Sequence, residues 1–225
     1  MIYGEQNPEN DEINTTRLEM TENGLSLIGK DMELHGDFMR MLPRLKTENL
    51  RSEFIVKAAK IKGADHTLRI VDATAGLGED SILLAASGYE VRRYEFDPVI
   101  AALLRDSMKR ALETEELHDI VSRMTLYEED SINAMRNLDY RPDVIVLDPM
   151  FPERRKSASV KKKFQLLQLL ERPCMQENEL LEAALAAKPR KIVIKRPLKG
   201  PVLAGIKPSY SIEGKAIRYD CILCG

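Results

Sequence analysis

The feature that most constrains the fold is a regular alternation of short apolar runs with helical segments from residue 68 onward. The apolar runs are rich in β-branched residues and bounded by polar turns, as buried strands are. They lie at residues 68–71, 89–96, 124–127, 143–147 and 191–195. The segment Pro98–Leu112 has helical spacing, and Asp97 before it is a typical helix cap. This alternation predicts an α/β fold with a doubly wound, mainly parallel sheet and right-handed crossovers.

Residues 1–65 follow a different pattern and are predicted to form a small N-terminal α+β appendage to a main domain, 66–225. Alternating apolar residues flank Asn23-Gly24, which predicts a hairpin turn at these two residues. A third strand is expected at Met32–Leu34, and one helix over Leu50–Ile61. Further elements are predicted at 164–170 and 179–187, as helices, and at 209–212 and 216–223, as a hairpin.

The composition is that of a globular protein that folds without disulfides. Apolar residues make up 44% of the 225 residues, and the apolar stretches fall short of the ~20 residues that a membrane-spanning helix needs. Three Cys without a framework, and an N-terminus without an apolar signal segment, predict a reducing, cytoplasmic location. Cys221 and Cys224 lack companion ligands for zinc, so no metal is expected.

The formal net charge of −2 conceals an asymmetry along the chain. Residues 1–150 carry 18 Lys and Arg against 29 Asp and Glu, whereas residues 151–225 carry 16 against 7. A cationic C-terminal third predicts a face that meets an anion, with nucleic acid as the first candidate. Solvated Lys and Arg that cluster without a partner are the alternative.

A glycine-containing turn, Asp72-Ala-Thr-Ala-Gly76-Leu-Gly78-Glu79-Asp80-Ser81, follows the first apolar run of the main domain. Gly76 and Gly78 allow a ligand to approach the backbone closely, at the start of a helix. A dinucleotide-binding turn has a third glycine where Ser81 stands, and the two acids before Ser81 would repel a pyrophosphate. The turn therefore favours a ligand with a positive or zwitterionic end; an ordinary tight turn is the alternative.

Acidic residues follow the next strands of the predicted sheet. Glu95 is placed to accept the ribose hydroxyls of an adenosine, and Asp130-Ser131 to accept from an adenine amino group. Asp72 is a candidate partner for an ammonium group, because a buried acid needs a partner. Although each acid alone could be solvated, their arrangement around Gly-x-Gly favours S-adenosylmethionine (SAM) over NAD.

The most specific motif is Asp148-Pro149-Met150-Phe151-Pro152, directly after a buried strand. Methylation of an exocyclic amino nitrogen requires acceptors that aim this nitrogen at the methyl donor. Asp148 and the Pro149 carbonyl are suitable acceptors, and Phe151 offers a face on which a flipped base can stack. A proline turn with a core Phe is the alternative interpretation.

Three segments closely resemble the bacterial family of 16S ribosomal RNA guanine-N2 methyltransferases, family J: DATAGLGEDSILLAASGYEVRRYEFDPVIAALL, VIVLDPMFPERRKSASVKKK and KIVIKRP. The resemblance implies a Rossmann-like class I methyltransferase sheet of seven strands with the last antiparallel. It also implies SAM as methyl donor and N2 of a guanine near the 3′ end of the small-subunit RNA as target. By position it assigns cofactor contacts to Glu79, Asp80, Glu95, Phe96, Asp130, Ser131 and Asp148.

Two basic runs follow the Asp148 motif, one from Arg154 to Lys163 and one from Lys188 to Lys199. Cations of this kind position RNA by contacting its phosphates. The residues predicted to contact ribosomal RNA or the small subunit are Arg154, Arg155, Lys161, Lys195 and Arg196. Three other functions stay open: an amino methyltransferase for another nucleic acid (adenine N6 of DNA or RNA), an NAD-dependent oxidoreductase, and a non-catalytic RNA-binding ribosome assembly factor.

Overall fold

The protein is described by a computed structural model, which places residues 16–29, 32–149 and 176–225. Its centre is a seven-stranded sheet of order β6-β5-β4-β7-β8-β10-β9. The strands are β4 (Arg69–Asp72), β5 (Glu90–Tyr94), β6 (Met124–Tyr127), β7 (Val144–Leu147), β8 (Lys191–Pro197), β9 (Tyr210–Glu213) and β10 (Ile217–Leu223).

The pairing of the strands confirms the doubly wound, mainly parallel sheet. Strands β6, β5, β4, β7 and β8 are parallel to one another, and β10 runs antiparallel to both β8 and β9. The order reverses at β4, because the chain first adds strands on one side and then crosses to the other. Ligands bind at such a switch point, beyond the carboxyl ends of the parallel strands.

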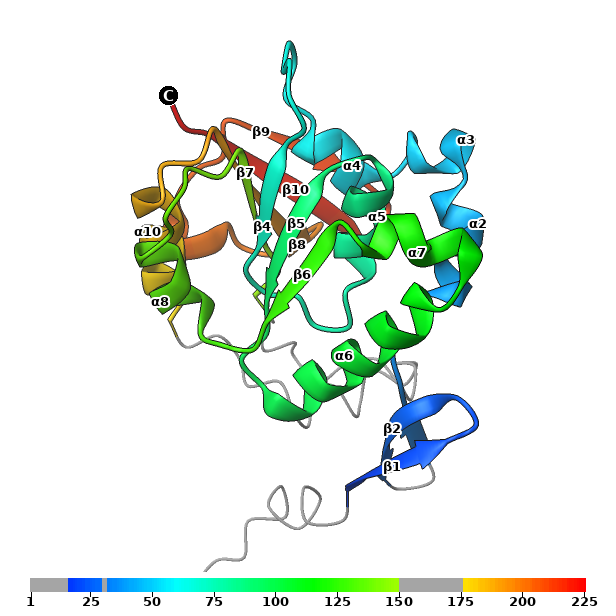
Figure 1. Ribbon diagram of the computed structural model, residues 1–225. Coiled ribbons are helices and arrows are strands. Elements are labelled where there is room, and N and C mark those ends of the chain that lie inside the picture. Colours follow the sequence, from blue (N-terminus) through cyan, green and yellow to red (C-terminus); the bar gives the residue numbers. More distant parts are fainter. Residues whose placement is uncertain (1–15, 30–31, 150–175) are drawn as a thin grey trace, which may run out of the picture.

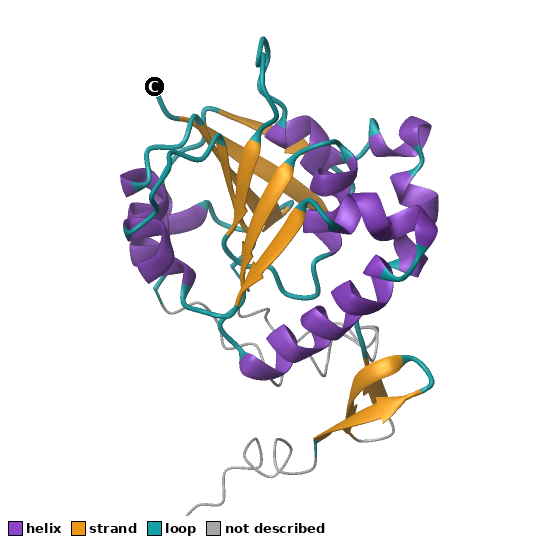
Figure 2. Cartoon of the chain, viewed as in Figure 1, coloured by secondary structure: helices purple, strands orange, loops and turns teal. Residues whose placement is uncertain are grey.

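Helices cover both faces of the sheet (Figures 1 and 2). One face carries α4 (Phe54–Ala59), α5 (Glu79–Ala86), α6 (Pro98–Leu112) and α7 (Glu115–Val121). The other face carries α8 (Ser131–Arg136) and α10 (Glu177–Ala186). The predicted helix 164–170 lies outside the described residues. In the part of the chain that the structure describes, no helix combines the length and the apolar character needed to cross a membrane.

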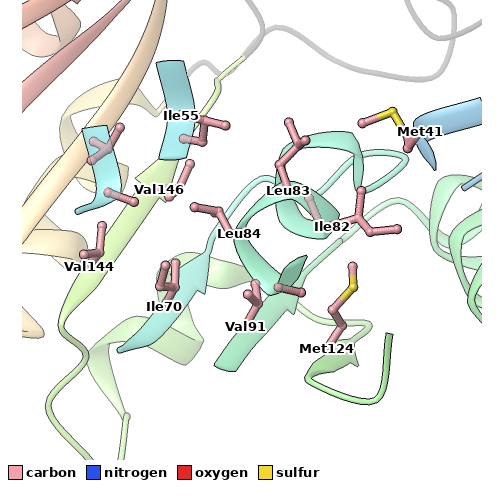
Figure 3. Close-up of a cluster of buried hydrophobic side chains, with 14 of the residues drawn as sticks. Met41, Ile55, Ile70, Ile82, Leu83, Leu84, Val91, Met124, Val144 and Val146 are labelled. Carbon is pink, nitrogen blue, oxygen red and sulfur yellow. The ribbon is translucent and has the colours of Figure 1, made fainter. Parts of the chain in front are cut away.

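Alternation along each strand divides the core into two layers. Ile70, Val91 and Val144 face α5 and pack with its apolar residues, as Figure 3 shows for Leu83 and Leu84. The next residues along β4 and β7, Val71 and Ile145, point to the opposite face of the sheet and pack against α8 and α10. Each fully buried side chain of this size contributes about 1.5–3 kcal/mol to the free energy of unfolding. The two layers therefore make the sheet a rigid platform for the loops at its edge.

A separate three-stranded antiparallel sheet precedes the main sheet, formed by β1 (Arg17–Thr21), β2 (Gly24–Gly29) and β3 (Met32–Leu34). The predicted hairpin and third strand are confirmed, but the turn lies one residue earlier than predicted. Thr21 pairs with Gly24, so the turn residues are Glu22 and Asn23, and Gly24 takes the positive φ of +92°. The sheet packs on α6 through Leu27 and Leu34.

The helix predicted over Leu50–Ile61 is present but shorter, because only Phe54–Ala59 within that segment forms a helix and Leu50 ends the preceding one. The chain forms the short elements η1 (Met39–Met41), α2 (Leu42–Leu45), α3 (Thr47–Leu50) and α4. Glu53 is extended, with ψ of 130°, and accepts from Arg44 Nε at 2.7 Å and Nη2 at 2.8 Å. This pair holds the break between α3 and α4. The helix α4 packs against β8, β9 and β10 of the main sheet. The domain boundary at residue 65 stays a prediction.

Candidate functional site

The turn between β4 and α5 has the backbone that its two glycines predict. Gly76 and Gly78 have positive φ values of 52° and 79°, and Gly78 directly precedes α5. A Cβ atom on Gly78 would lie only 2.6 Å from Arg93 Nη1. Glycine is therefore required at position 78 for both conformation and space. The turn lies at the carboxyl end of β4, with Gly76 half-buried and Gly78 buried.

Glu95, which directly follows β5, lies against this turn. Its Oε2 accepts from the Gly76 N–H at 2.9 Å, and its Oε1 accepts from the Asp97 N–H at 2.9 Å. Burial raises the pKa of Glu95 to about 7, against the opposing effect of these two hydrogen bonds. Two backbone N–H groups therefore hold the carboxylate that we expect to bind the ribose, and burial destabilises its charged form.

Asp72 ends β4 with 3% of its surface exposed. Ser81 Oγ donates to its Oδ2 at 2.5 Å, and the Thr74 N–H donates to its Oδ1 at 3.3 Å. Burial raises the pKa of Asp72 to about 6, although the Ser81 hydrogen bond lowers it. Ser81 thus replaces the third glycine of a dinucleotide turn with a hydroxyl group that orients an acid.

Asp130 and Ser131 follow β6 at the start of α8. Asp130 caps this helix: its Oδ1 accepts from the Ile132 N–H at 3.0 Å, and its Oδ2 accepts from Asn133 Nδ2 at 2.9 Å. Ser131 is buried, whereas Phe96, beside Glu95, is 75% exposed. The cofactor contacts predicted for these residues and for Glu79 stay predictions.

Asp148 and Pro149 follow β7 and lie next to the glycine turn. The Asp148 N–H donates to Thr74 Oγ1 at 2.6 Å, which ties the Asp148 motif to the loop after β4. The carboxylate Oδ2 lies 2.9 Å from Lys195 Nζ. Burial raises the pKa of Asp148, while Lys195 opposes this rise. Phe151, predicted to stack on a base, lies outside the described residues.

The cations predicted to contact RNA fall into two groups. Arg154, Arg155 and Lys161 lie outside the described residues. Lys195 is paired with carboxylates, and Arg196 is 1% exposed, with Nε donating to the Pro201 carbonyl at 3.0 Å. In this structure the last two are therefore not surface cations.

The second basic run also does not border the candidate site along its whole length. Lys191 begins β8 and pairs in register with Val144, the first residue of β7, so it lies at the opposite edge of the sheet. It is 5% exposed, and its Nζ donates to the carbonyls of Ala58 and Lys60 at 2.9 and 2.7 Å. This lysine anchors α4 to the sheet.

Two residues of the site were not predicted from the sequence. Thr74 joins the two site loops through its hydroxyl group. Arg93 is fully buried beneath Gly78, where burial lowers its pKa to about 10 and the charge of Asp72 opposes this. The sequence of β5, EVRRY, also contains Glu90 and Arg92, so it did not single out Arg93 as the buried cation. Among the described residues, no group of three or more His, Cys, Asp or Glu could hold a metal ion.

Comparison with known proteins identifies the family to which this site belongs. A model of a family of SAM-dependent methyltransferases matches residues 5–223. The ribosomal RNA small subunit methyltransferase J of Chromobacterium violaceum is 41% identical over 214 residues, which cover 93% of this chain and 81% of that protein. The chain belongs to this methyltransferase J family. The Pseudomonas fluorescens member is 47% identical over 153 residues, covering 68% of this chain and 59% of the relative.

Solved structures agree with this membership. A SAM-dependent methyltransferase from Neisseria gonorrhoeae has a TM-score of 0.75 and 30% identity, covering 93% of this chain and 83% of that one. The rRNA methyltransferase AviRa from Streptomyces viridochromogenes shares the fold, with a TM-score of 0.53, 16% identity and coverage of 78% and 84%. As a member of the methyltransferase J family, this chain is an enzyme that uses SAM.

The residues present fit SAM as a ligand. The turn after β4 has two glycines at positive φ and leads directly into the N-terminus of α5. Asp72, Glu95 and Asp148 gather acidic groups whose pKa values burial raises. Acids in that state are stabilised by a nearby cation, and SAM carries both a sulfonium and an ammonium group.

Proposed function

We propose that this enzyme transfers the methyl group of SAM to the exocyclic N2 of a guanine in 16S ribosomal RNA. The observation that carries the proposal is the position of Asp148. Its backbone is tied to the glycine-turn loop through Thr74, so an acceptor for an amino group lies directly beside the loop expected to hold the methyl donor. The names of the relatives, ribosomal RNA small subunit methyltransferase J, support the RNA as substrate.

The roles of the chain follow from the contacts at the strand ends. Asp72 would hold the ammonium group of SAM, Glu95 the ribose hydroxyls, and Asp130-Ser131 the adenine. When bound, SAM supplies an electrophilic methyl group. Asp148 and the Pro149 carbonyl would each accept a hydrogen bond from the N2 amino group. These two bonds would direct the nitrogen lone pair at the methyl carbon. As the N–C bond forms and the S–C bond breaks, one N2 proton is released, and the Asp148 carboxylate is placed to accept it.

The RNA would bind over the Asp148 loop and the basic segment that follows it. Arg154, Arg155 and Lys161 are retained as the proposed phosphate contacts. Lys195 and Arg196 are not, because one is paired with acids and the other is buried. A ribosomal RNA substrate also implies that the enzyme works in the cytoplasm, on free RNA or on the small subunit.

The test is methylation of 16S RNA and of small subunits with methyl-labelled SAM, followed by mapping of the modified nucleotide. We expect label on N2 of one guanine. Asp148→Ala should lower kcat by about 10²–10⁴-fold, because the amino group loses its acceptor, and should leave RNA affinity within about threefold. The matched control is Asp119→Ala, whose side chain is 90% exposed on α7, before the amino end of β6; it should retain the parent rate.

Each alternative function gives a different result in this experiment. Label on an adenine N6 would replace the target and keep the chemistry. RNA binding without any methyl transfer by the parent protein would favour a non-catalytic assembly factor. Equal turnover by Asp148→Ala and the parent would remove Asp148 from the reaction.

A further inference from the structure

Lys195 joins three separate elements at the candidate site. It lies on β8, and its Nζ donates to Asp80 Oδ2, in the first turn of α5, at 2.9 Å. The same Nζ lies 2.9 Å from Asp148 Oδ2, after β7. The side chain of Lys195 is 26% exposed, and those of Asp80 and Asp148 are 17% and 39% exposed. One ammonium group therefore bridges the start of the helix and the proposed amino-group acceptor.

The ammonium group of Lys195 offsets the repulsion between the carboxylates of Asp80 and Asp148. Both carboxylates have an oxygen 2.9 Å from the same nitrogen, and the nearby charge of Asp80 acts to raise the pKa of Asp148. A protonated Asp148 would be a poorer acceptor for an amino group, since one of its oxygens then carries a hydrogen. Desolvation lowers the pKa of Lys195, but the two acids outweigh this and hold it well above its usual range.

Lys195 also restricts where the Asp148 side chain can point. The backbone N–H of Asp148 is held by Thr74 at 2.6 Å, and the carboxylate is held by Lys195. With both ends held, one carboxylate oxygen faces the lysine and the other is left to accept from a substrate. A displacement of about 1 Å in such a group can cost about 10²-fold in rate.

We propose that Lys195 is a positioning residue for methyl transfer, which orients the Asp148 carboxylate and balances its charge against that of Asp80. This inference rests on the proposed function, in which Asp148 accepts the target amino group. It reassigns Lys195 from RNA binding to the support of the acceptor. Other charged or titratable groups that act on this cluster are Arg196 from β8, Tyr219 from β10, Arg44 from α2 and Asp72 from β4.

The variant that tests the proposal is Lys195→Met, which keeps much of the side-chain length and removes the charge. We expect kcat at pH 7 to fall by about 10–100-fold, with KM for RNA changed by less than about threefold. The acid limb of the kcat profile should move up by about one pH unit or more, because Asp148 then ionises beside Asp80 without a cation. Lys195→Arg should recover part of the rate and the parent pH profile.

The matched control is Lys62→Met, the same substitution at an exposed lysine in the turn before β4. It removes one positive charge at the opposite edge of the sheet and should leave kcat and the pH profile unchanged. A large rise in KM for RNA in Lys195→Met, with parent kcat and pH profile, would overturn the proposal and restore RNA binding as the role of Lys195.

A second measurement does not depend on the RNA substrate. The ¹³C resonances of the aspartate carboxyl groups can be titrated in the free enzyme and assigned with Asp148→Asn and Asp80→Asn. The Asp148 midpoint should rise by about one unit or more in Lys195→Met and fall in Asp80→Asn, which keeps the cation and removes the competing acid. If both variants leave the midpoint unchanged, Lys195 has no such role. Failure of the parent to methylate guanine would instead contradict the proposed function, and this titration would still decide the role of Lys195.

Discussion

Two aspartates lie at opposite ends of the same buried strand, and their surroundings differ. Asp143 directly precedes β7, and Asp148 directly follows it. Asp143 is 5% exposed, yet its carboxylate accepts from the Arg69 N–H at 2.9 Å and contacts His66 Nε2 at 3.0 Å. Although burial acts to raise its pKa, these partners hold the pKa of Asp143 below its usual value.

The acids at the carboxyl end of the sheet lack that degree of compensation. Burial raises the pKa of Asp72 to about 6 and that of Glu95 to about 7, and it raises the pKa of Asp148 as well. The amino end thus has an acid whose partners come from the chain itself. At the carboxyl end, Lys195 pairs with Asp148, but the hydrogen bonds to Asp72 and Glu95 come from neutral groups, a state that favours binding of a cationic ligand.

Of the substitutions that distinguish the carboxyl end of the sheet from the amino end, one at Glu95 is expected to have the largest effect, on the affinity for SAM. Glu95→Gln removes the charge and one of the two carboxylate oxygens of the acid proposed to bind the ribose, so the affinity for SAM should fall by about 10–100-fold. Isothermal titration measures this loss directly. Glu90→Gln is the matched control, because Glu90 is an exposed residue at the other end of β5. Equal SAM affinity in the parent and Glu95→Gln would show that Glu95 does not contact the cofactor.

A smaller effect is expected from pH. SAM binding favours the ionised acids, so its Kd should rise as the pH falls from 8 through about 7 and then about 6, the pKa values of Glu95 and Asp72. A change of about tenfold between pH 8 and pH 6 is expected for the Glu95 step. Glu95→Gln should lose the step near pH 7 and keep the one near pH 6. A Kd that stays flat from pH 8 to pH 5.5 would contradict the assignment of both acids.

Without SAM, the effect of pH should be reversed: ionisation of these acids strengthens SAM binding but lowers the free energy of unfolding of the free enzyme. Since the folded pKa of Glu95 lies above its ordinary value of 4.5, the folded state binds the proton more tightly than the unfolded state does. The contribution of Glu95 to the free energy of unfolding therefore falls as the pH rises from about 4.5 to about 7. Urea denaturation of the parent and of Glu95→Gln at several pH values isolates this contribution as a difference in slope.

The fold and the strand-end acids could be predicted from the sequence because their signals are local. The apolar run of β7, the Asp97-Pro98 helix start and the glycine turn each occupy a few consecutive residues. The bounds of α6 were predicted to the residue, since a cap and an apolar stripe define them. The break between α3 and α4 was missed because it depends on the pairing of Glu53 with Arg44, which periodicity does not reveal.

The role of Lys195 could not be predicted for a related reason. In the sequence it is one of several cations near the C-terminus, and its partner Asp80 is 115 residues away. Only the strand order, which places β8 beside β7 and the end of β7 beside the glycine turn, brings the three side chains together. Lys191, four residues earlier on the same strand, reaches the opposite edge and has a different partner set. Net charge along the chain therefore overstated the cations available to RNA.

The smallest effect on activity is expected at the amino end of the sheet. Asp143→Asn removes the charge that faces His66 and Arg190, so the free energy of unfolding at pH 7 should fall by about 1–3 kcal/mol, while kcat stays within about twofold of the parent. Because the folded pKa of Asp143 lies below its ordinary value of 3.8, this stabilisation is present above about pH 4 and is lost as the pH falls further. The control is Asp65→Asn, whose 97% exposed side chain contacts the other nitrogen of His66; this substitution should leave the free energy of unfolding unchanged. If Asp143→Asn lowered kcat as much as Asp148→Ala does, the two ends of β7 would be coupled. The amino end could then not be assigned to stability alone and the carboxyl end to catalysis.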